Sequence, residues 1–314
     1  MGEHGQSAFE PDALEDRSAV DATAPTPSDP RDVESLEGRS SADTDVTLDA
    51  ADPAVERERV CAFIERTVGD ADADGVVVAM SGGLDSTVTA ALAVEALGSE
   101  SVYGLILPCN KIGAPHARDA EALADALGID HDTVHLQPLF AQLGAVAPER
   151  FDLHDDPIRS GNAIARLRMT MAYLAANATG RLVCGTSNRS ERLLGYLTKY
   201  GDGAADLLPL GHLYKTDVRA LAAEIDVPQF VVEKPPTAGF LPGQRDEEDL
   251  GAPYETIDRV LRLGVDRGLD PEAIAERLDS TDCVDAATVA DLLARHRATA
   301  HKRGPPSIPT DPDE

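Results

Sequence analysis

A string of seven residues, SGGLDST at positions 81–87, follows an apolar run and opens a predicted helix. Its two glycines let backbone N–H groups turn inward, and the hydroxyls of Ser81, Ser86 and Thr87 add donors beside a helix N-terminus, which favours negative charge. The string therefore predicts a phosphate site. Because no lysine follows in the order G-K-[ST], it is not a Walker A loop. A plain Gly-Gly turn with an aspartate N-cap is the structural alternative.

Asp85, inside this string, puts a carboxylate where phosphates would bind. The two groups repel each other unless a cation bridges them, so we expect a hard divalent ion, Mg²⁺, at Asp85. Glu191 is the natural second carboxylate for that ion. It belongs to the string GTSNRSE at 185–191, which follows a predicted strand. The carboxyl edge of the strands is where α/β sheets bind ligands.

Positive charge is concentrated between residues 159 and 215. Eight Arg and Lys stand there against three Asp and Glu, a net charge of +5 within a chain whose net charge is −28. We expect an anion to bind this segment, although ion pairing with the acidic remainder would also explain the charge. Arg166 and Arg168 are two apart on a predicted helix and point to different faces. One of them can therefore reach a site while the other makes a helix or subunit contact.

The elements that must position these residues alternate along the chain. Short apolar runs predict buried parallel strands, and amphipathic patterns between them predict helices. The strands are expected at 75–80, 102–107, 132–136 and 181–184, and the helices at 55–68, 86–97, 115–127 and 161–177. Further helices are expected at 217–225, 254–264, 271–278 and 286–297, with a loop at 235–249. This order predicts an α/β fold, a doubly wound, Rossmann-like parallel sheet with a helical C-terminal part.

Composition limits the classes of function. The chain has 56 Asp and Glu against 28 Lys and Arg. This acidity argues against a nucleic acid or an anionic membrane surface as partner, and no apolar run reaches the roughly 18 residues of a membrane span. It also indicates a halophilic source, since salt screens self-repulsion. Four scattered cysteines predict reduced thiols and a cytoplasmic protein.

Both ends of the chain differ from its middle. Residues 1–52 hold fourteen Asp and Glu and three Arg, with several prolines and little apolar periodicity, so they predict a disordered acidic extension. Residues 303–314 predict a flexible tail. An extension of this length is too short for a glutaminase domain.

Longer strings resemble the ammonia-dependent NAD synthetase family, within the N-type ATP pyrophosphatase superfamily. They are GNAIARLRM from 161, GTSNRSERLLGYLTKYGDGAADLLPLG from 185, LYKTDV from 213 and PPTAGFLPGQRDEEDLGAPYETID from 235. The resemblance covers about residues 53–308, with the catalytic domain at 53–302. It implies an adenine nucleotide alpha hydrolase-like fold and a homodimer. Ser187 stands where the family usually has Gly or Asp, which makes the backbone conformation there the point to examine.

The reaction that this resemblance implies has two steps. ATP adenylates the nicotinate carboxylate of deamido-NAD, and ammonia then displaces AMP to leave the amide. Ammonia is expected to be the direct donor unless a separate glutaminase subunit supplies it.

The resemblance also implies roles for individual residues, carried over by position. ATP would be bound by Ser81, Gly82, Gly83, Leu84, Ser86, Thr87, Leu107, Thr186, Lys215 and Thr237, with Pro108 beside the adenine. Deamido-NAD would be bound by Arg166, Tyr196, Lys199 and Asp202, and Mg²⁺ by Asp85 and Glu191. Lys215, Asp202 and Asp85 would be catalytic.

Two other functions could use a similar loop. A GMP synthetase-like or tRNA-modifying adenylating enzyme shares it, but the tRNA form needs a basic surface and usually a catalytic cysteine. A non-catalytic nucleotide-binding module of the universal-stress type would bind ATP without turnover, and would leave Glu191, Asp202 and Lys215 unexplained. Pyrophosphate release that depends on deamido-NAD separates these functions.

Overall fold

The computed structural model describes residues 51–109, 114–153, 155–237, 243–282, 284–306 and 308–309. The predicted acidic extension lies outside these residues except for Ala51 and Asp52. The Asp52 carboxylate accepts a hydrogen bond from Ala54 N at 3.0 Å and so caps helix α1 (Pro53–Asp70). At the other end, Arg303 is the first residue of the predicted flexible tail. It donates hydrogen bonds to Leu193 O (2.8 Å) and His296 O (2.7 Å).

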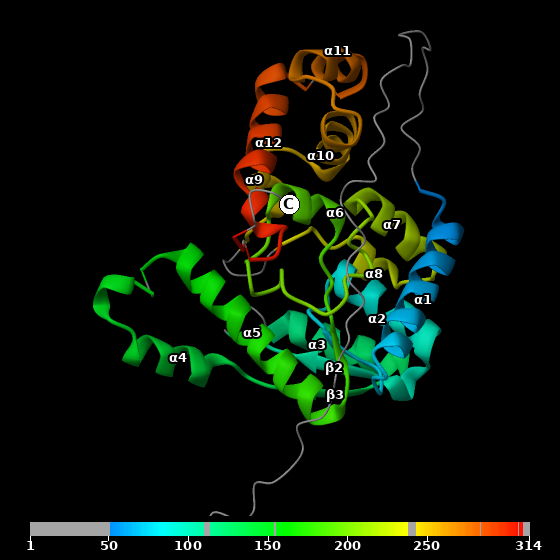
Figure 1. Cartoon of the computed structure of the whole chain (residues 1–314), viewed down its shortest axis with the longest axis vertical. Coiled ribbons are helices and arrows are strands. Elements are labelled where there is room, and N and C mark those ends of the chain that lie inside the picture. The colour runs from blue at the N-terminus through cyan, green and yellow to red at the C-terminus, as the bar shows by residue number, and fades with distance from the viewer. Residues whose placement is uncertain are drawn as a thin grey trace, which may run out of the picture. The chain divides into compact units, whose positions relative to one another are not determined.

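Four parallel strands form one sheet in the order β3-β2-β1-β4 (Figure 1). They are β1 (Val76–Ala79), β2 (Val102–Ile106), β3 (Asp130–Thr133) and β4 (Leu182–Cys184). The chain adds β2 and β3 on one side of β1 and then returns to add β4 on the other. The strand order therefore reverses between β1 and β4, which is the position where open α/β sheets leave a crevice for ligands.

Helices cover both faces of the sheet. Successive side chains of a strand point to opposite faces, so an apolar strand such as β1 supplies buried residues to both. Val76 and Val78 pack in one core cluster with α1, α2 (Leu84–Leu97), α3 (Ala114–Leu127) and α7 (Lys215–Glu224). Val77, between them in β1, packs in another cluster with residues of α5 (Pro157–Thr179). The predicted doubly wound α/β fold is confirmed.

The C-terminal helices form a third cluster. Helices α10 (Tyr254–Leu261), α11 (Pro271–Asp282) and α12 (Ala286–Ala298) pack on Leu194 and Tyr214. The helix predicted at 254–264 is α10 followed by a π-helical turn, η3 (Arg262–Asp266). Figure 1 shows these helices together at the end of the molecule away from the sheet.

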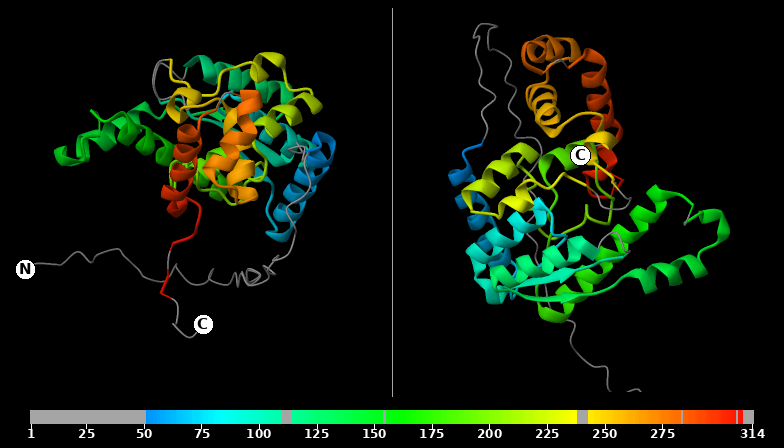
Figure 2. Two further views of the ribbon diagram at one scale, coloured as in Figure 1. Left: turned by 90° about the horizontal axis from the view of Figure 1, so that it is seen from above. Right: turned by 180° about the vertical axis from the view of Figure 1, so that it is seen from behind.

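Several short elements were not predicted. They are α4 (Gln137–Val146), α6 (Arg189–Leu194), α8 (Gln229–Val232), α9 (Asp246–Leu250) and the 3-10 turns η1 (Ser99–Ser101), η2 (Glu149–Phe151) and η4 (Ala300–Lys302). Helix α9 occupies the end of the segment expected to be a loop. Figures 1 and 2 show α4 and the start of α5 as an arm that stands away from the other helices.

The third strand begins two residues before the expected 132–136. Asp130 pairs with Tyr103 of β2, and this strand lies at the edge of the sheet, where acidic side chains can remain in solvent. The strand was therefore predicted to start too late, because its first residues do not form an apolar run. The backbone that follows β3 still pairs with β2, since Val134 N donates to Ile106 O at 2.8 Å.

Among the described residues, no helix is both long and apolar enough to cross a membrane. Cys61, Cys109 and Cys184 are free thiols. Burial raises the pKa of Cys61 to about 11, so this thiol stays protonated at neutral pH.

Candidate active site

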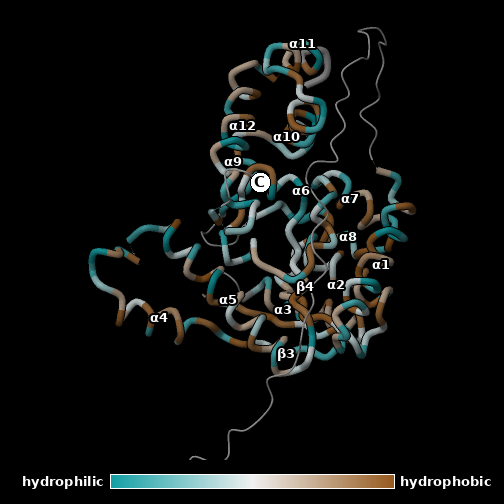
Figure 3. The backbone as a smooth tube through the Cα atoms, in the orientation of Figure 1, coloured by the Kyte–Doolittle hydropathy of each residue, from teal (hydrophilic) through white to brown (hydrophobic). Residues whose placement is uncertain are grey.

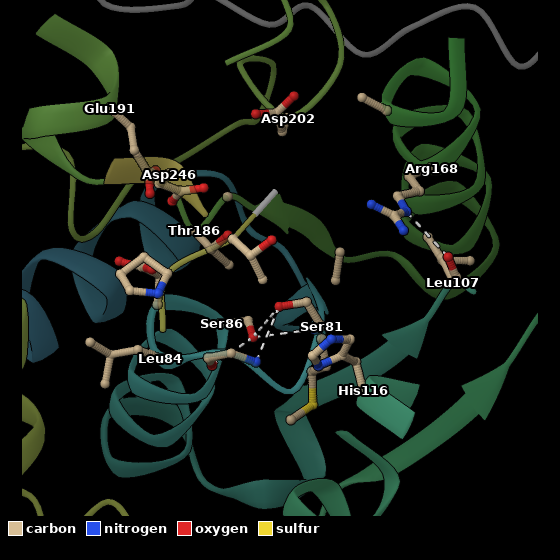
Figure 4. Close-up of a pocket in the computed structure, with 18 of the residues that line it drawn as sticks. Ser81, Leu84, Ser86, Leu107, His116, Arg168, Thr186, Glu191, Asp202 and Asp246 are labelled. Atoms are coloured by element: carbon tan, nitrogen blue, oxygen red, sulfur yellow. Dashed lines mark hydrogen bonds between the residues drawn. The ribbon is translucent and has the colours of Figure 1, made fainter. Parts of the chain in front are cut away.

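A cavity of about 600 Å³ opens at the carboxyl ends of β1, β2 and β4, at the reversal of strand order (Figure 4). Twelve of the predicted site residues line it: Ser81, Gly83, Leu84, Asp85, Ser86, Leu107, Thr186, Glu191, Tyr196, Asp202, Lys215 and Thr237. Pro108 lines it as well. Residues from distant parts of the sequence thus meet at one place because parallel strands end on one edge.

The loop after β1 is folded around its own hydroxyl groups. Ser81 N donates to Ser86 Oγ at 3.2 Å, Gly83 N donates to Ser81 Oγ at 3.3 Å, and Ser86 Oγ donates to Gly83 O at 3.1 Å. Gly82 has a φ of +72°, and a Cβ there would lie 2.5 Å from His116 O. Only glycine fits at position 82, so the geometry of the turn requires the first glycine of the string.

Thr87 and Gly82 do not line the cavity in this structure. The Thr87 side chain is buried and its hydroxyl donates to Gly83 O at 2.8 Å, so it stabilises the loop on the side away from the cavity. Lys234, which directly precedes the loop predicted at 235–249, donates to Gly82 O at 2.8 Å and to Asp119 at 2.6 Å. It places a positive charge beside the predicted phosphate loop, which contains no lysine of its own.

A buried cluster of opposite charges lies beside this loop. The Lys215 ammonium is hydrogen-bonded to Asp85 Oδ2 and lies 3.6 Å from Glu191 Oε1, and its side chain is 5% exposed. Asn188 Nδ2 donates to the other oxygen of Asp85 at 2.9 Å. Asp85 is the second residue of α2, Glu191 the third of α6 and Lys215 the first of α7, so three helix N-terminal segments converge here.

This cluster shifts the pKa values of its members. Burial, together with the nearby Asp85 carboxylate, raises the pKa of Glu191 to about 8. Burial alone lowers the pKa of Lys215, but the Asp85 and Glu191 carboxylates outweigh it and the pKa stays above its ordinary value. Lys215 is therefore a permanent cation, whereas the Glu191 carboxyl takes up a proton far more readily than an ordinary glutamate does.

Asp246, at the start of α9, closes the cluster from the side of the C-terminal helices. It accepts hydrogen bonds from Tyr196 OH (3.0 Å) and Tyr254 OH (3.2 Å). Burial raises its pKa, and Lys215 opposes that shift. No sequence signal marks Asp246, because it is the first of four consecutive acidic residues, 246–249, and nothing distinguishes it from its neighbours.

The two arginines of the string GNAIARLRM have different positions. Arg168 lines the cavity, and its Nε donates to Leu107 O at 3.2 Å (Figure 4). Burial lowers its pKa. Arg166, predicted to bind deamido-NAD, is exposed outside the cavity and donates to Lys199 O at 3.2 Å. The spacing predicted that one arginine faces a site without indicating which, and the family resemblance pointed to Arg166; the arginine that lines this cavity is Arg168.

Lys199 also lies outside this cavity, since its ammonium donates to His301 O at 2.7 Å. Asp202 faces the cavity and accepts from Thr198 N at 2.9 Å. Ser187 is buried, donates to Asp202 O at 3.3 Å and is not among the residues with positive φ. Serine therefore fits this position without backbone strain and ties the loop after β4 to the Asp202 loop.

Asp85 and Glu191 have the donor chemistry that Mg²⁺ requires. Mg²⁺ commonly binds one or two carboxylates together with substrate phosphates and water. Within the described part of the chain, no three His, Cys, Asp or Glu side chains form a metal cage. Asp85 and Glu191 share the Lys215 ammonium, and the raised pKa of Glu191 shows that a further positive charge would be favourable there. These two carboxylates therefore fit a divalent cation whose remaining ligands are phosphate oxygens and water.

Comparison with known proteins identifies the family. A family model described as NAD synthase matches residues 56–306. The chain belongs to the NAD synthase family. Among curated relatives, the NH(3)-dependent NAD(+) synthetase of Halobacterium salinarum is 41% identical over 265 residues, covering 84% of this chain and 96% of that protein. The protein of the same description from Methanosarcina mazei is 42% identical over 254 residues, covering 81% and 96%.

Solved structures agree. NMN synthetase from Francisella tularensis superimposes with a TM-score of 0.70 at 33% identity, covering 83% of this chain and 100% of that chain. NH3-dependent NAD synthetase from Campylobacter jejuni, in complex with nitrate, gives 0.67 at 29% identity, covering 83% and 100%. The family, the fold and the assignment to the NAD synthase ligases are confirmed.

Proposed function

We propose that this chain catalyses the ATP-dependent amidation of deamido-NAD with ammonia, forming NAD, AMP and pyrophosphate. One observation supports the proposal. A loop that presents backbone N–H groups and hydroxyls lines the same cavity as a buried lysine and two carboxylates. A carboxylate is a poor acyl donor, so an enzyme that makes an amide from it must first activate it. The curated relatives are named for the same reaction product.

The chemistry proceeds in two displacements. An oxygen of the nicotinate carboxylate attacks the α-phosphorus of ATP, and the bond to the leaving pyrophosphate breaks. Ammonia then attacks the acyl carbon, AMP departs with that oxygen, and one proton is released. The first step builds negative charge on the phosphates, which fixed donors and cations stabilise.

The residues that line the cavity supply those donors. Ser81, Gly83 and Ser86 hold the pyrophosphate, and Lys215 stabilises the charge of the transferring phosphoryl group. Thr186 and Thr237 contact the nucleotide, Leu84 lies beside the loop, and Leu107 with Pro108 borders the adenine. Asp202 and Tyr196 border the deamido-NAD. Gly82 and Thr87 act through the loop conformation, since neither lines the cavity.

Asp85 and Glu191 would hold Mg²⁺. The ion, when bound, neutralises charge on the pyrophosphate leaving group. The contribution of the chain is to keep both carboxylates beside Lys215 and the phosphate loop.

We also propose a cytoplasmic homodimer. The arm exposes Val146 (66%), Phe151 (53%) and Ile158 (75%), and Figure 3 shows apolar stretches along α4. Arg166 and Lys199 lie outside the cavity of their own chain, so a role for them in binding deamido-NAD requires substrate shared with a second copy. Light scattering of wild type and Ile158→Asp tests this: the variant is expected as a monomer, and a monomeric wild type would contradict it.

One assay tests the function. The amide product, NAD from deamido-NAD or NMN from the carboxylate form of NMN, is measured with ATP, Mg²⁺ and either ammonium or glutamine as nitrogen donor, in molar KCl. The mononucleotide is included because the Francisella tularensis relative is an NMN synthetase. We expect amide formation with deamido-NAD and ammonium. Faster turnover of the mononucleotide, or equal rates with glutamine, would refute the assignment.

A further inference from the structure

Helix α10 holds a buried carboxylate, Asp258, against the segment that carries Lys215. Asp258 is 1% exposed. One of its oxygens accepts from Ser190 Oγ, and the other accepts from Thr216 N at 2.8 Å. Thr216 N is one of the first backbone N–H groups of α7, which have no partner within their own helix.

Ser190 connects the same carboxylate to Lys215 itself. Its hydroxyl donates to Asp258 and accepts from Lys215 N at 2.9 Å. Ser190 also directly precedes Glu191 in α6. One buried carboxylate on α10 therefore fixes the backbone at the two places from which the Lys215 and Glu191 side chains leave.

The side-chain end of Lys215 meets the same helix one turn earlier. Its Nζ lies 5.5 Å from the centre of the Tyr254 ring, within the range of a cation–π contact. Residues four apart on a helix lie on the same face, so one face of α10 places Tyr254 at the ammonium of Lys215 and Asp258 at the donors beside its backbone, Ser190 Oγ and Thr216 N. Burying a carboxylate is costly, and an apolar side chain would fill this place at lower cost. What Asp258 adds is two acceptors aimed at α6 and α7.

We propose that Asp258 is a positioning residue, which acts through Ser190 and the N-terminus of α7 to hold the Lys215 ammonium on Asp85 and Glu191. The proposal takes the reaction from the proposed function. Its geometric part, the control of Lys215 by Asp258, is independent of the substrate.

The variant Asp258→Asn tests this with little change of shape. The amide oxygen can accept from one of the two donors, but its NH2 group must then face the other. A matched control is Glu56→Gln. Glu56 is another buried carboxylate, 6% exposed, which lies in α1 and contacts His212. A general effect of disturbing a buried acid would appear in both variants.

Lysine NMR gives a readout that does not depend on activity. The chain has five lysines, so the side-chain signals are few, and Lys215→Arg assigns the one of interest. We expect Asp258→Asn and Ser190→Ala to shift the Lys215 signal, and Glu56→Gln to leave it unchanged. An unmoved signal in a folded Asp258→Asn or Ser190→Ala protein would overturn the proposal, and Ser190→Ala decides it where Asp258→Asn does not fold.

Kinetics test the consequence. Small misplacements of a catalytic group cost up to about 100-fold in rate, so we expect kcat to fall by about 10-fold to 100-fold in Asp258→Asn while KM for ATP stays close to that of wild type. In the Lys215→Ala background the same substitution should have no further effect. Independent, multiplying losses would overturn the proposal. A wild type that does not amidate deamido-NAD would instead refute the proposed function, and the NMR result would still decide the role of Asp258.

Discussion

Replacing Lys215 by methionine removes one charge from the centre of the site and keeps most of the side-chain volume. The ammonium of Lys215 is buried between Asp85 and Glu191, and all three side chains are less than one-fifth exposed. The substitution therefore leaves two carboxylates close together without their shared cation. Both stability and catalysis should respond.

The structure sets the size of each response. Charges about 4 Å apart attract by about 4 kcal/mol at an effective dielectric constant near 20, and removing one member of a buried pair costs about 3–5 kcal/mol. We take the lower end, about 3 kcal/mol at pH 8, because Glu191 can accept a proton and reduce the repulsion. Loss of one fixed charge at a developing anion costs about 10²-fold to 10³-fold in rate.

Urea unfolding at pH 8 and ATP–pyrophosphate exchange dependent on deamido-NAD measure the two effects. The control is Arg57→Met, which removes a cation from an exposed pair with Glu95 and should change neither quantity appreciably. A Lys215→Met protein that exchanges pyrophosphate at the wild-type rate would refute the role of Lys215. A protein as stable as wild type at pH 8 would refute the buried charge cluster.

Three further predictions concern the metal, the pH dependence and salt. Asp85→Asn should lower turnover by about 10²-fold, and excess Mg²⁺ should restore part of it; no response to Mg²⁺ would remove Asp85 from the metal site. Glu191 has a pKa of about 8 when folded and near 4.5 ordinarily, so the folded state binds the extra proton between these values. In EDTA, wild-type stability should fall with rising pH across this window by up to about 1.4 kcal/mol per pH unit relative to Glu191→Gln, and parallel curves would contradict this. With a net charge of −28, the melting temperature should rise with KCl, and a maximum without salt would end the halophilic interpretation.

The sequence predicted the elements that have a repeating pattern. The apolar run GVVVAM, the second strand and the long helices were placed within a few residues, because burial on both sheet faces demands continuous apolar strands. The third strand was placed late because an edge strand can begin with the polar pair Asp130 and His131. Helices α6 and α9 were missed because helices of so few residues have no period to detect.

The site was predicted where chemistry is visible in a local string. The loop around Asp85 is one such string, and Lys215 and Glu191 stood out as charges in strings typical of the family. The choice between Arg166 and Arg168 depends on how α5 is rotated, which only packing decides. Asp246, Asp258 and Lys234 act through contacts with residues 50, 42 and 152 positions away, and no local pattern encodes such a partner.

The most direct test of the account follows the oxygen atoms of the carboxylate. Deamido-NAD that carries ¹⁸O at both oxygens of its nicotinate carboxylate is converted with ATP, Mg²⁺ and ammonium. The masses of the products are then measured by mass spectrometry. If the cavity binds ATP with its α-phosphorus facing the carboxylate, each AMP must carry one ¹⁸O and the amide the other. Unlabelled AMP, or ADP with labelled inorganic phosphate, would contradict attack at the α-phosphorus.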